Sequence, residues 1–153
     1  MITTIMRRRL IALLASLAAA PLLPFRSVRA QPDTFAALLD QVTGGAPVRA
    51  GRVKVDTPRL ADNGHSVPLT VSVESPMTAA DHVRSITLLS ERNPRPLMAT
   101  FHLGPKAGRA AVATRVRLNG TQRVLAVARL SDGSYWSGTA EVEVTESACL
   151  DMS

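Results

Sequence analysis

The sequence has few of the residue types on which several classes of protein depend. Its 153 residues include one cysteine, so no disulfide can form within the chain. Aromatic residues make up 3% of the chain, which argues against a stacking surface for single-stranded nucleic acid. All 12 acidic residues lie at or after Asp33. Their absence before that point separates the first part of the chain from the rest.

The formal net charge of +6 depends on the first thirty residues. Five of the 18 basic residues fall within residues 1–30, and the remaining 13 face 12 acidic residues. Without residues 1–30 the chain carries a net charge of +1. This charge is too small to indicate binding to nucleic acid or to an anionic membrane. Hydrophobic residues at 46% and charged residues at 20% predict a packed core, and the length suits a single domain.

Residues 1–30 have the pattern of an export signal peptide. Three arginines at 7–9 precede an apolar stretch of 14 residues at 10–23, and Val28-Arg29-Ala30 matches a cleavage site. The apolar stretch is shorter than the ~20 residues that a membrane-spanning helix needs, although an uncleaved N-terminal anchor is the alternative. The arginine pair favours the twin-arginine route over the Sec route. The mature chain, residues 31–153, is then expected in the periplasm without a membrane anchor.

A short amphipathic helix is predicted at the start of the mature chain. Phe35, Leu38, Leu39 and Val42 follow the i, i+3, i+4, i+7 spacing of one helix face, and Gly44-Gly45 ends the pattern. A helix of about ten residues is marginal by itself, so this apolar face must dock on another element.

Beyond Pro47 the hydrophobic period changes to two, which indicates strands. Val67, Leu69, Val71 and Val73 alternate with more polar residues, and further strands are predicted at 83–91, 97–103, 110–118, 122–130 and 135–145. About seven short strands with frequent turn signals are typical of an all-β, immunoglobulin-like antiparallel β-sandwich. We therefore predict one sandwich domain with its N-terminal helix at 31–145, followed by a C-terminal arm at 146–153.

Cys149 is the foremost candidate for chemistry. It lies four residues from the C-terminus and beyond the last predicted strand, which argues against the buried structural thiol that is the alternative. An unpaired cysteine in an exported protein suggests a reactive thiol or a disulfide that links two copies. A thiol on a short arm suits a reversible covalent bond to a sulfur compound. Glu146, Asp151 and the terminal carboxylate favour its neutral form, which indicates a carrier activated by partners.

Histidines and arginines supply the other candidate sites. His65, His82 and His102 are separated by 17 and 20 residues and lack the spacing of metal ligands, so we predict no metal and no cofactor. A site that joins these histidines to Cys149 in space is the alternative. A basic stripe is also predicted if the strands of residues 115–117 and 123–129 pair; the four arginines concerned are Arg115, Arg117, Arg123 and Arg129. Such a stripe is either a solvated sheet face or a surface that attracts anions or partners.

Residues 58–145 closely resemble SoxY, the sulfur-carrier subunit of the bacterial thiosulfate-oxidation (Sox) system. The matching segments occur in order at matching spacing and are Leu60-Ala61-Asp62-Asn63-Gly64, Val67-Pro68-Leu69-Thr70-Val71, Glu74-Ser75-Pro76-Met77-Thr78, Glu91-Arg92-Asn93-Pro94-Arg95-Pro96, Ala99-Thr100-Phe101-His102 and Ser131-Asp132-Gly133-Ser134. A twin-arginine leader and an N-terminal helix also suit that family.

The resemblance implies a covalent carrier rather than an enzyme. SoxY proteins have an immunoglobulin-like sandwich and pair with SoxZ in the periplasm. Thiosulfate-derived sulfur is held on a cysteine in a Gly-Gly-Cys-Gly-Gly arm, and Cys149 is the residue here that matches this position. The implied partners are a SoxZ-like subunit in a heterodimer and, transiently, the Sox cytochrome, hydrolase and sulfur dehydrogenase. A homodimer linked through Cys149 is a further expectation.

The C-terminal arm departs from the family pattern because it contains no glycine. Its residues are Glu146-Ser147-Ala148-Cys149-Leu150-Asp151-Met152-Ser153. Glycine-rich arms are flexible and slip into narrow channels, whereas Leu150 and Met152 are bulky. A diverged paralogue that serves another sulfur compound or another partner set fits this departure. The rival hypotheses are a degenerate SoxY-like scaffold without carrier activity and a metal-binding redox enzyme that uses the histidines with Cys149.

Overall fold

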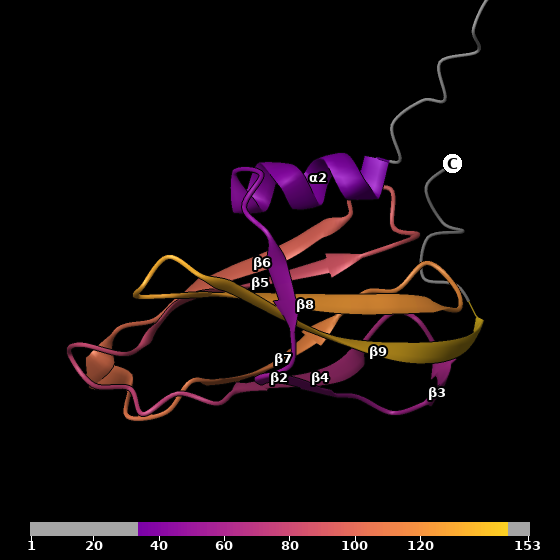
Figure 1. Cartoon of the computed structure of the whole chain (residues 1–153). Helices are drawn as coiled ribbons and strands as arrows, with labels where there is room; N and C mark the ends of the chain where they lie inside the picture. Colours follow the sequence, from indigo (N-terminus) through magenta and orange to yellow (C-terminus); the bar gives the residue numbers. More distant parts are fainter. Residues whose placement is uncertain (1–33, 147–153) are drawn as a thin grey trace, which may run out of the picture. The chain divides into compact units, whose positions relative to one another are not determined.

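The computed structural model describes residues 34–146, and it consists of one α-helix, nine strands and a short 3-10 turn over that range (Figure 1). The predicted signal peptide and Cys149 lie outside the described residues. In the described part no helix has the length and apolar character needed to cross a membrane. The elements are α2 (Thr34–Thr43), β1 (Val48–Ala50), β2 (Val53–Asp56), β3 (Leu60–Asn63), β4 (Val67–Val73), β5 (Val83–Ser90), β6 (Leu97–His102), η2 (Pro105–Ala107), β7 (Ala111–Val116), β8 (Gln122–Leu130) and β9 (Tyr135–Glu146).

Two sheets face one another, which confirms the predicted all-β sandwich. The larger sheet has the order β1-β9-β8-β5-β6, with β3 also paired to β9, and the smaller sheet has the order β2-β4-β7. Alternation explains the packing: Val67, Leu69, Val71 and Val73 of β4 are buried, and the residues between them are more exposed. Their side chains meet the inner face of β5 and β8 in one apolar core.

The helix covers part of the outer face of the larger sheet. Its four predicted apolar residues, Phe35, Leu38, Leu39 and Val42, pack against Leu89, Leu125, Val127 and Tyr135 of the sheet. Figure 1 shows α2 on the side of this sheet away from the smaller one. Tyr135 lies on this outer face, and the helix covers it so that only 9% of its surface is exposed. The same helix explains why β5 and β8 are apolar on both faces.

Strand β9 has two parallel partners that the prediction of about seven antiparallel strands did not include. Strand β1 pairs with the beginning of β9, and β3 pairs with its end, both in parallel. These short strands lack the alternation that marks a strand in sequence: β1 has three residues and β3 has four, and they are mostly exposed. They stand on the side of β9 opposite β8 and so protect much of an otherwise open edge.

The chain passes from the larger sheet to the smaller one directly over Gly138. After β1 the backbone turns at Gly51 and Arg52, which both have positive φ, and the Gly51 N–H donates to the Ser137 carbonyl at 3.2 Å. Val53 then lies so close to β9 that a Cβ at Gly138 would overlap the Val53 carbonyl oxygen and come within 2.9 Å of its carbon. Glycine is therefore the residue that permits this crossing.

Replacing Gly138 with Ala should destabilise the fold strongly. The added methyl group meets backbone rather than a flexible side chain, so β2 or β9 must move, at a cost of about 2–3 kcal/mol. Gly104→Ala is the matched control, because Gly104 has an extended φ of −144° and no atom lies within 4 Å of the position that its methyl group would take. Urea unfolding of both variants measures the difference, and equal stabilities would contradict the account of the crossing.

Candidate functional site

Cys149 lies outside the described residues, so the structure describes the place from which its segment begins. Strand β9 pairs with β8 only as far as Val142. The remaining residues, Glu143–Glu146, extend past the end of β8 and pair instead with β3. Without β3 this overhang would have no strand partner on that side. The short parallel strand therefore fixes the position at which the C-terminal segment starts.

Side-chain and backbone hydrogen bonds hold this starting point from both sides. On the β3 side, the Gly64 N–H donates to the Glu146 carbonyl at 2.7 Å, and the Thr145 hydroxyl donates to the Asp62 carbonyl. On the other side, the Val144 N–H donates to the Thr121 hydroxyl oxygen at 3.0 Å. We call Thr121, Gly64 and Glu143–Glu146 the arm root. It is a rigid platform by its hydrogen bonding, although it is exposed to solvent.

The charges on and beside the arm root are mainly acidic. Glu141, Glu143 and Glu146 are exposed along β9, and Asp62 is exposed on β3 beside them. Arg59 lines a small hollow of about 170 Å³ with Glu141, Glu143 and Thr121. Carboxylates near a thiol favour its neutral form. The electrostatics of the arm root therefore do not supply the positive surroundings that activate a cysteine within one chain.

The three histidines do not converge. His65 follows Gly64 beside the arm root, His102 ends β6, and His82 precedes β5 with a ring nitrogen 3.1 Å from the Thr78 carbonyl oxygen. Within residues 34–146, no three His, Cys, Asp or Glu side chains come together as a metal site would require. The described residues thus give no support to the hypothesis of a histidine metal centre.

The predicted basic stripe does not form, because the strands concerned belong to different sheets. Arg115 lies on β7 of the smaller sheet, whereas Arg123 and Arg129 lie on β8 of the larger one. The turn at Asn119-Gly120 carries the chain from one sheet to the other rather than forming a hairpin. Sequence alternation identifies strands but not their neighbours, so the pairing could not be read from it.

Arg123 has a local partner instead. Its guanidinium donates hydrogen bonds to Glu91 and forms an ion pair with it, and these hydrogen bonds lower the pKa of the Glu91 carboxyl below its usual value. The same pair raises the pKa of Arg123. The Arg123 side chain is exposed and that of Glu91 is partly exposed, and ion pairs at such a surface contribute little to stability. This part of the predicted stripe is thus neutralised.

A second group of cations surrounds Trp136. The guanidinium carbons of Arg49 and Arg52 lie 5.6 and 5.0 Å from the centre of its ring, and the indole N–H donates to the Ser134 hydroxyl at 3.2 Å. Hydrogen bonds from Ser134 lower the pKa of Asp132, and the charges of the two arginines act in the same direction. The aromatic ring contacts both guanidinium groups and Asp132 interacts with their charges, so these cations already have partners within the protein.

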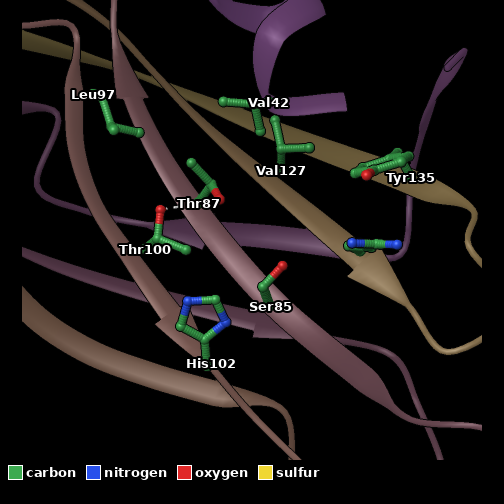
Figure 2. A pocket seen from close by; sticks show the side chains of 9 residues that line it. Val42, Ser85, Thr87, Leu97, Thr100, His102, Val127 and Tyr135 are labelled. Carbon is green, nitrogen blue, oxygen red and sulfur yellow. Dashed lines mark hydrogen bonds between the residues drawn. The ribbon is translucent and has the colours of Figure 1, made fainter. Parts of the chain in front are cut away.

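Sequence reasoning missed a hollow on the outer face of the larger sheet. It has a volume of about 240 Å³ and lies beside Val42, near the end of α2. Figure 2 shows Ser85 and Thr87 of β5 next to Thr100 and His102 of β6, with Tyr135 and Val127 on the opposite side. His102 and Arg129 both line it, although each was considered separately in the sequence. Only the strand order β8-β5-β6 brings them together.

The sequence model of the family "Sulfur oxidation protein SoxY" matches residues 39–149. The chain belongs to the SoxY family. The match includes the second half of the helix, both sheets and, at its last residue, the position of Cys149. No match was found among curated protein sequences.

Solved structures agree with the SoxY fold. The sulfur carrier protein SoxY from Chlorobium limicola f thiosulfatophilum superposes with a TM-score of 0.61 and 24% identity, over 72% of this chain and 94% of that one. A superoxide reductase (neelaredoxin) from Ignicoccus hospitalis gives a TM-score of 0.55 and 20% identity, over 61% and 80%. At these identities the likeness concerns the fold. It therefore brings no metal chemistry to this SoxY-family chain.

Removing the Thr121 hydroxyl should loosen the arm root. Thr121→Val keeps the shape of the side chain but leaves the part-buried Val144 N–H without its acceptor, so we expect a loss of about 1–2 kcal/mol. Thr139→Val is the control, since the exposed Thr139 hydroxyl has no hydrogen-bond partner among residues 34–146. Amide exchange should quicken at Glu143–Glu146 only in Thr121→Val. Equal protection in the two variants would show that this hydrogen bond does not hold the root.

Proposed function

We propose that this SoxY-family protein is a periplasmic covalent carrier that holds thiosulfate-derived or related sulfur on Cys149. The observation that carries the proposal is the family match, which extends to residue 149, the position of the chain's single cysteine. The Chlorobium protein of similar fold is itself described as a sulfur carrier. The proposal includes export by way of residues 1–30, which leaves residues 31–153 as the mature chain.

The chemistry requires one thiol and a partner protein that accepts electrons. When the Cys149 thiol joins the outer sulfur of thiosulfate, a disulfide-type S–S bond forms, and one proton and two electrons leave. A carrier cannot keep these electrons, so a cytochrome partner accepts them, and other partners later remove sulfate and oxidise the remaining sulfur. The acidic arm root suits such a division of labour, because it does not activate the thiol by itself.

The arm root gives the carrier a fixed origin. Covalent geometry keeps the Cα atom of Cys149 within about 11 Å of that of Glu146, whose carbonyl is bonded to Gly64. A partner enzyme that grips the sandwich therefore meets the thiol within a small volume near β3 and the end of β9. In this proposal partner enzymes bind the sandwich domain, and the short C-terminal segment presents the sulfur group bound to Cys149.

The glycine-poor arm supports a different choice of partners from that of the standard SoxY arm. Ala148, Leu150 and Asp151 stand where the family pattern has glycine, and their side chains widen the segment on both sides of Cys149. This departure also favours the second candidate function, a SoxY-like scaffold that binds partners without carrying sulfur. The two functions differ in whether Cys149 becomes modified.

Cys149→Ser should abolish sulfur loading without harming the fold. The position lies beyond Val144, the last core-facing residue of β9, so we expect a stability change below about 0.5 kcal/mol. Intact mass after incubation with thiosulfate and the Sox cytochrome should show an adduct on the native protein and none on the variant. Ser147→Ala, a change in the same segment that keeps the thiol, is the control and should load normally. A native protein that gains no adduct but still binds its partner would favour the scaffold function.

A SoxZ-like subunit should form a heterodimer with this chain. Among the strands of residues 34–146, β6 and β7 are outer strands with one unpaired backbone edge each. Native proteins usually cover such edges, and a partner can do so here. Size exclusion at micromolar concentration should give a heterodimer on co-expression. Without the partner, a homodimer linked through Cys149 should form under oxidising conditions and dissociate with reductant. A chain that stays monomeric beside the SoxZ-like protein would contradict the partnership.

A further inference from the structure

The hollow on the outer face of the larger sheet, here called the β5–β6 hollow, has a polar floor and apolar walls. Its volume of about 240 Å³ is several times the ~30 Å³ that one water occupies in the liquid. Ser85, Thr87 and Thr100 supply hydroxyl groups, and Leu97 and Tyr135 stand at its sides (Figure 2). Apolar walls around polar groups are typical of sites for small ligands.

Strand register places a cation, a hydroxyl and an imidazole in one row across this hollow. Arg129 of β8 is opposite Ser85 of β5, and Ser85 is opposite His102 of β6. The next row along the strands contains Val127, Thr87 and Thr100. Neighbouring strands lie about 4.8 Å apart, so the two longer side chains flank the Ser85 hydroxyl and can reach over it from both sides.

These polar groups have few partners inside the protein. Arg129 stacks on Tyr135, with its guanidinium carbon 5.9 Å from the ring centre, and forms no ion pair with any carboxylate among residues 34–146. Over the same range the Ser85 hydroxyl and the His102 ring have no hydrogen-bond partner. The nearly buried Thr87 hydroxyl reaches only Thr100, at 3.4 Å. No Asp or Glu lines the hollow among the described residues.

We propose that the β5–β6 hollow binds a small tetrahedral oxyanion of sulfur, sulfate or thiosulfate, without covalent reaction. Arg129 supplies a charge-assisted pair of N–H donors, and Ser85, Thr87 and His102 supply further donors from the floor and the far wall. A metal ion does not fit this set because the guanidinium repels it, and the absence of carboxylates favours an anion. The choice of sulfur among tetrahedral oxyanions rests on the proposed function.

This oxyanion site is separate from the carrier cysteine. The hollow lies beside Tyr135, at the first residue of β9, whereas the arm root lies at the last residue, Glu146. The rise of the strand between them is about 36 Å. Because Cys149 follows Glu146 by three residues, it lies within about 11 Å of the root and cannot enter the hollow of its own chain.

Titration of the Cys149→Ser protein with sodium sulfate and, separately, sodium thiosulfate tests the proposal without interference from thiol chemistry. Ionic strength is held constant with sodium chloride, and NMR follows the amides of residues 85, 87 and 100. Saturable shifts are expected at these amides with both salts. Arg129→Gln should weaken binding at least about tenfold, because it removes the charged donor. Arg123→Gln, the same change on the same strand and outside the hollow, should alter the Kd by less than twofold.

Three outcomes would overturn the oxyanion site: shifts that never saturate, saturation that maps to the Arg49–Trp136–Arg52 cluster, or equal weakening by the two arginine variants. Sodium phosphate serves as a third arm, and saturation by phosphate alone would overturn the assignment to sulfur oxyanions. Since every titration uses protein without the thiol, these results are independent of whether native Cys149 becomes loaded.

Discussion

The passage of the Val53 backbone over Gly138 is the constraint on which the arrangement of the two sheets depends. At that point the chain crosses from the larger sheet into β2 of the smaller one, and it passes so close to β9 that a side chain at residue 138 has no room. The crossing brings the edge of the smaller sheet against β9 and leaves β1 and β3 to pair with the two ends of that strand. Strand β9 can thus be longer than β8, and its overhang becomes the arm root. The close contact at Gly138 and the pairing with β3 therefore constrain the two parts of the same strand.

The outer face of the larger sheet imposes a second constraint. Strands β5 and β8 are apolar on both sides, which is stable only when both sides are covered. The ten-residue helix α2 covers the part around Leu125 and Tyr135. It ends at Thr43, and the sheet beyond it changes to hydroxyl and imidazole side chains at Ser85, Thr100 and His102. The β5–β6 hollow lies where that cover stops, so its polar character fits its partial exposure to water.

Periodicity predicted most of the regular elements, because each of them buries one face. The helix at 34–43 and the strands at 67–73 and 122–130 agree with the expected ranges. In each of them the buried apolar residues, such as Leu38, Leu69 and Val124, belong to a series with the spacing of that element. The three- and four-residue strands β1 and β3 were not predicted, because their backbone pairing requires no apolar pattern in the sequence. Cys149 was selected from its position in the sequence alone.

The sequence did not predict which strands pair with one another. A basic stripe that includes Arg115 and Arg129 required their strands to pair, yet the chain changes sheet between them. Arg129 and His102 were not expected together, although the register through Ser85 aligns them in one row. Alternation along β9 also cannot show that the helix at the other end of the domain covers Tyr135. Charged and polar sites built across strands depend on this long-range pairing.

The carrier claim is tested most directly by fragmenting the intact protein in a mass spectrometer after its purification from cells that oxidise a reduced sulfur compound. The account predicts a chain that begins at Gln31 and a C-terminal fragment whose mass is increased by sulfur or by a sulfonate-bearing group on Cys149. Reductant should remove the added mass. A C-terminal fragment that carries the free thiol throughout active sulfur oxidation would contradict the claim.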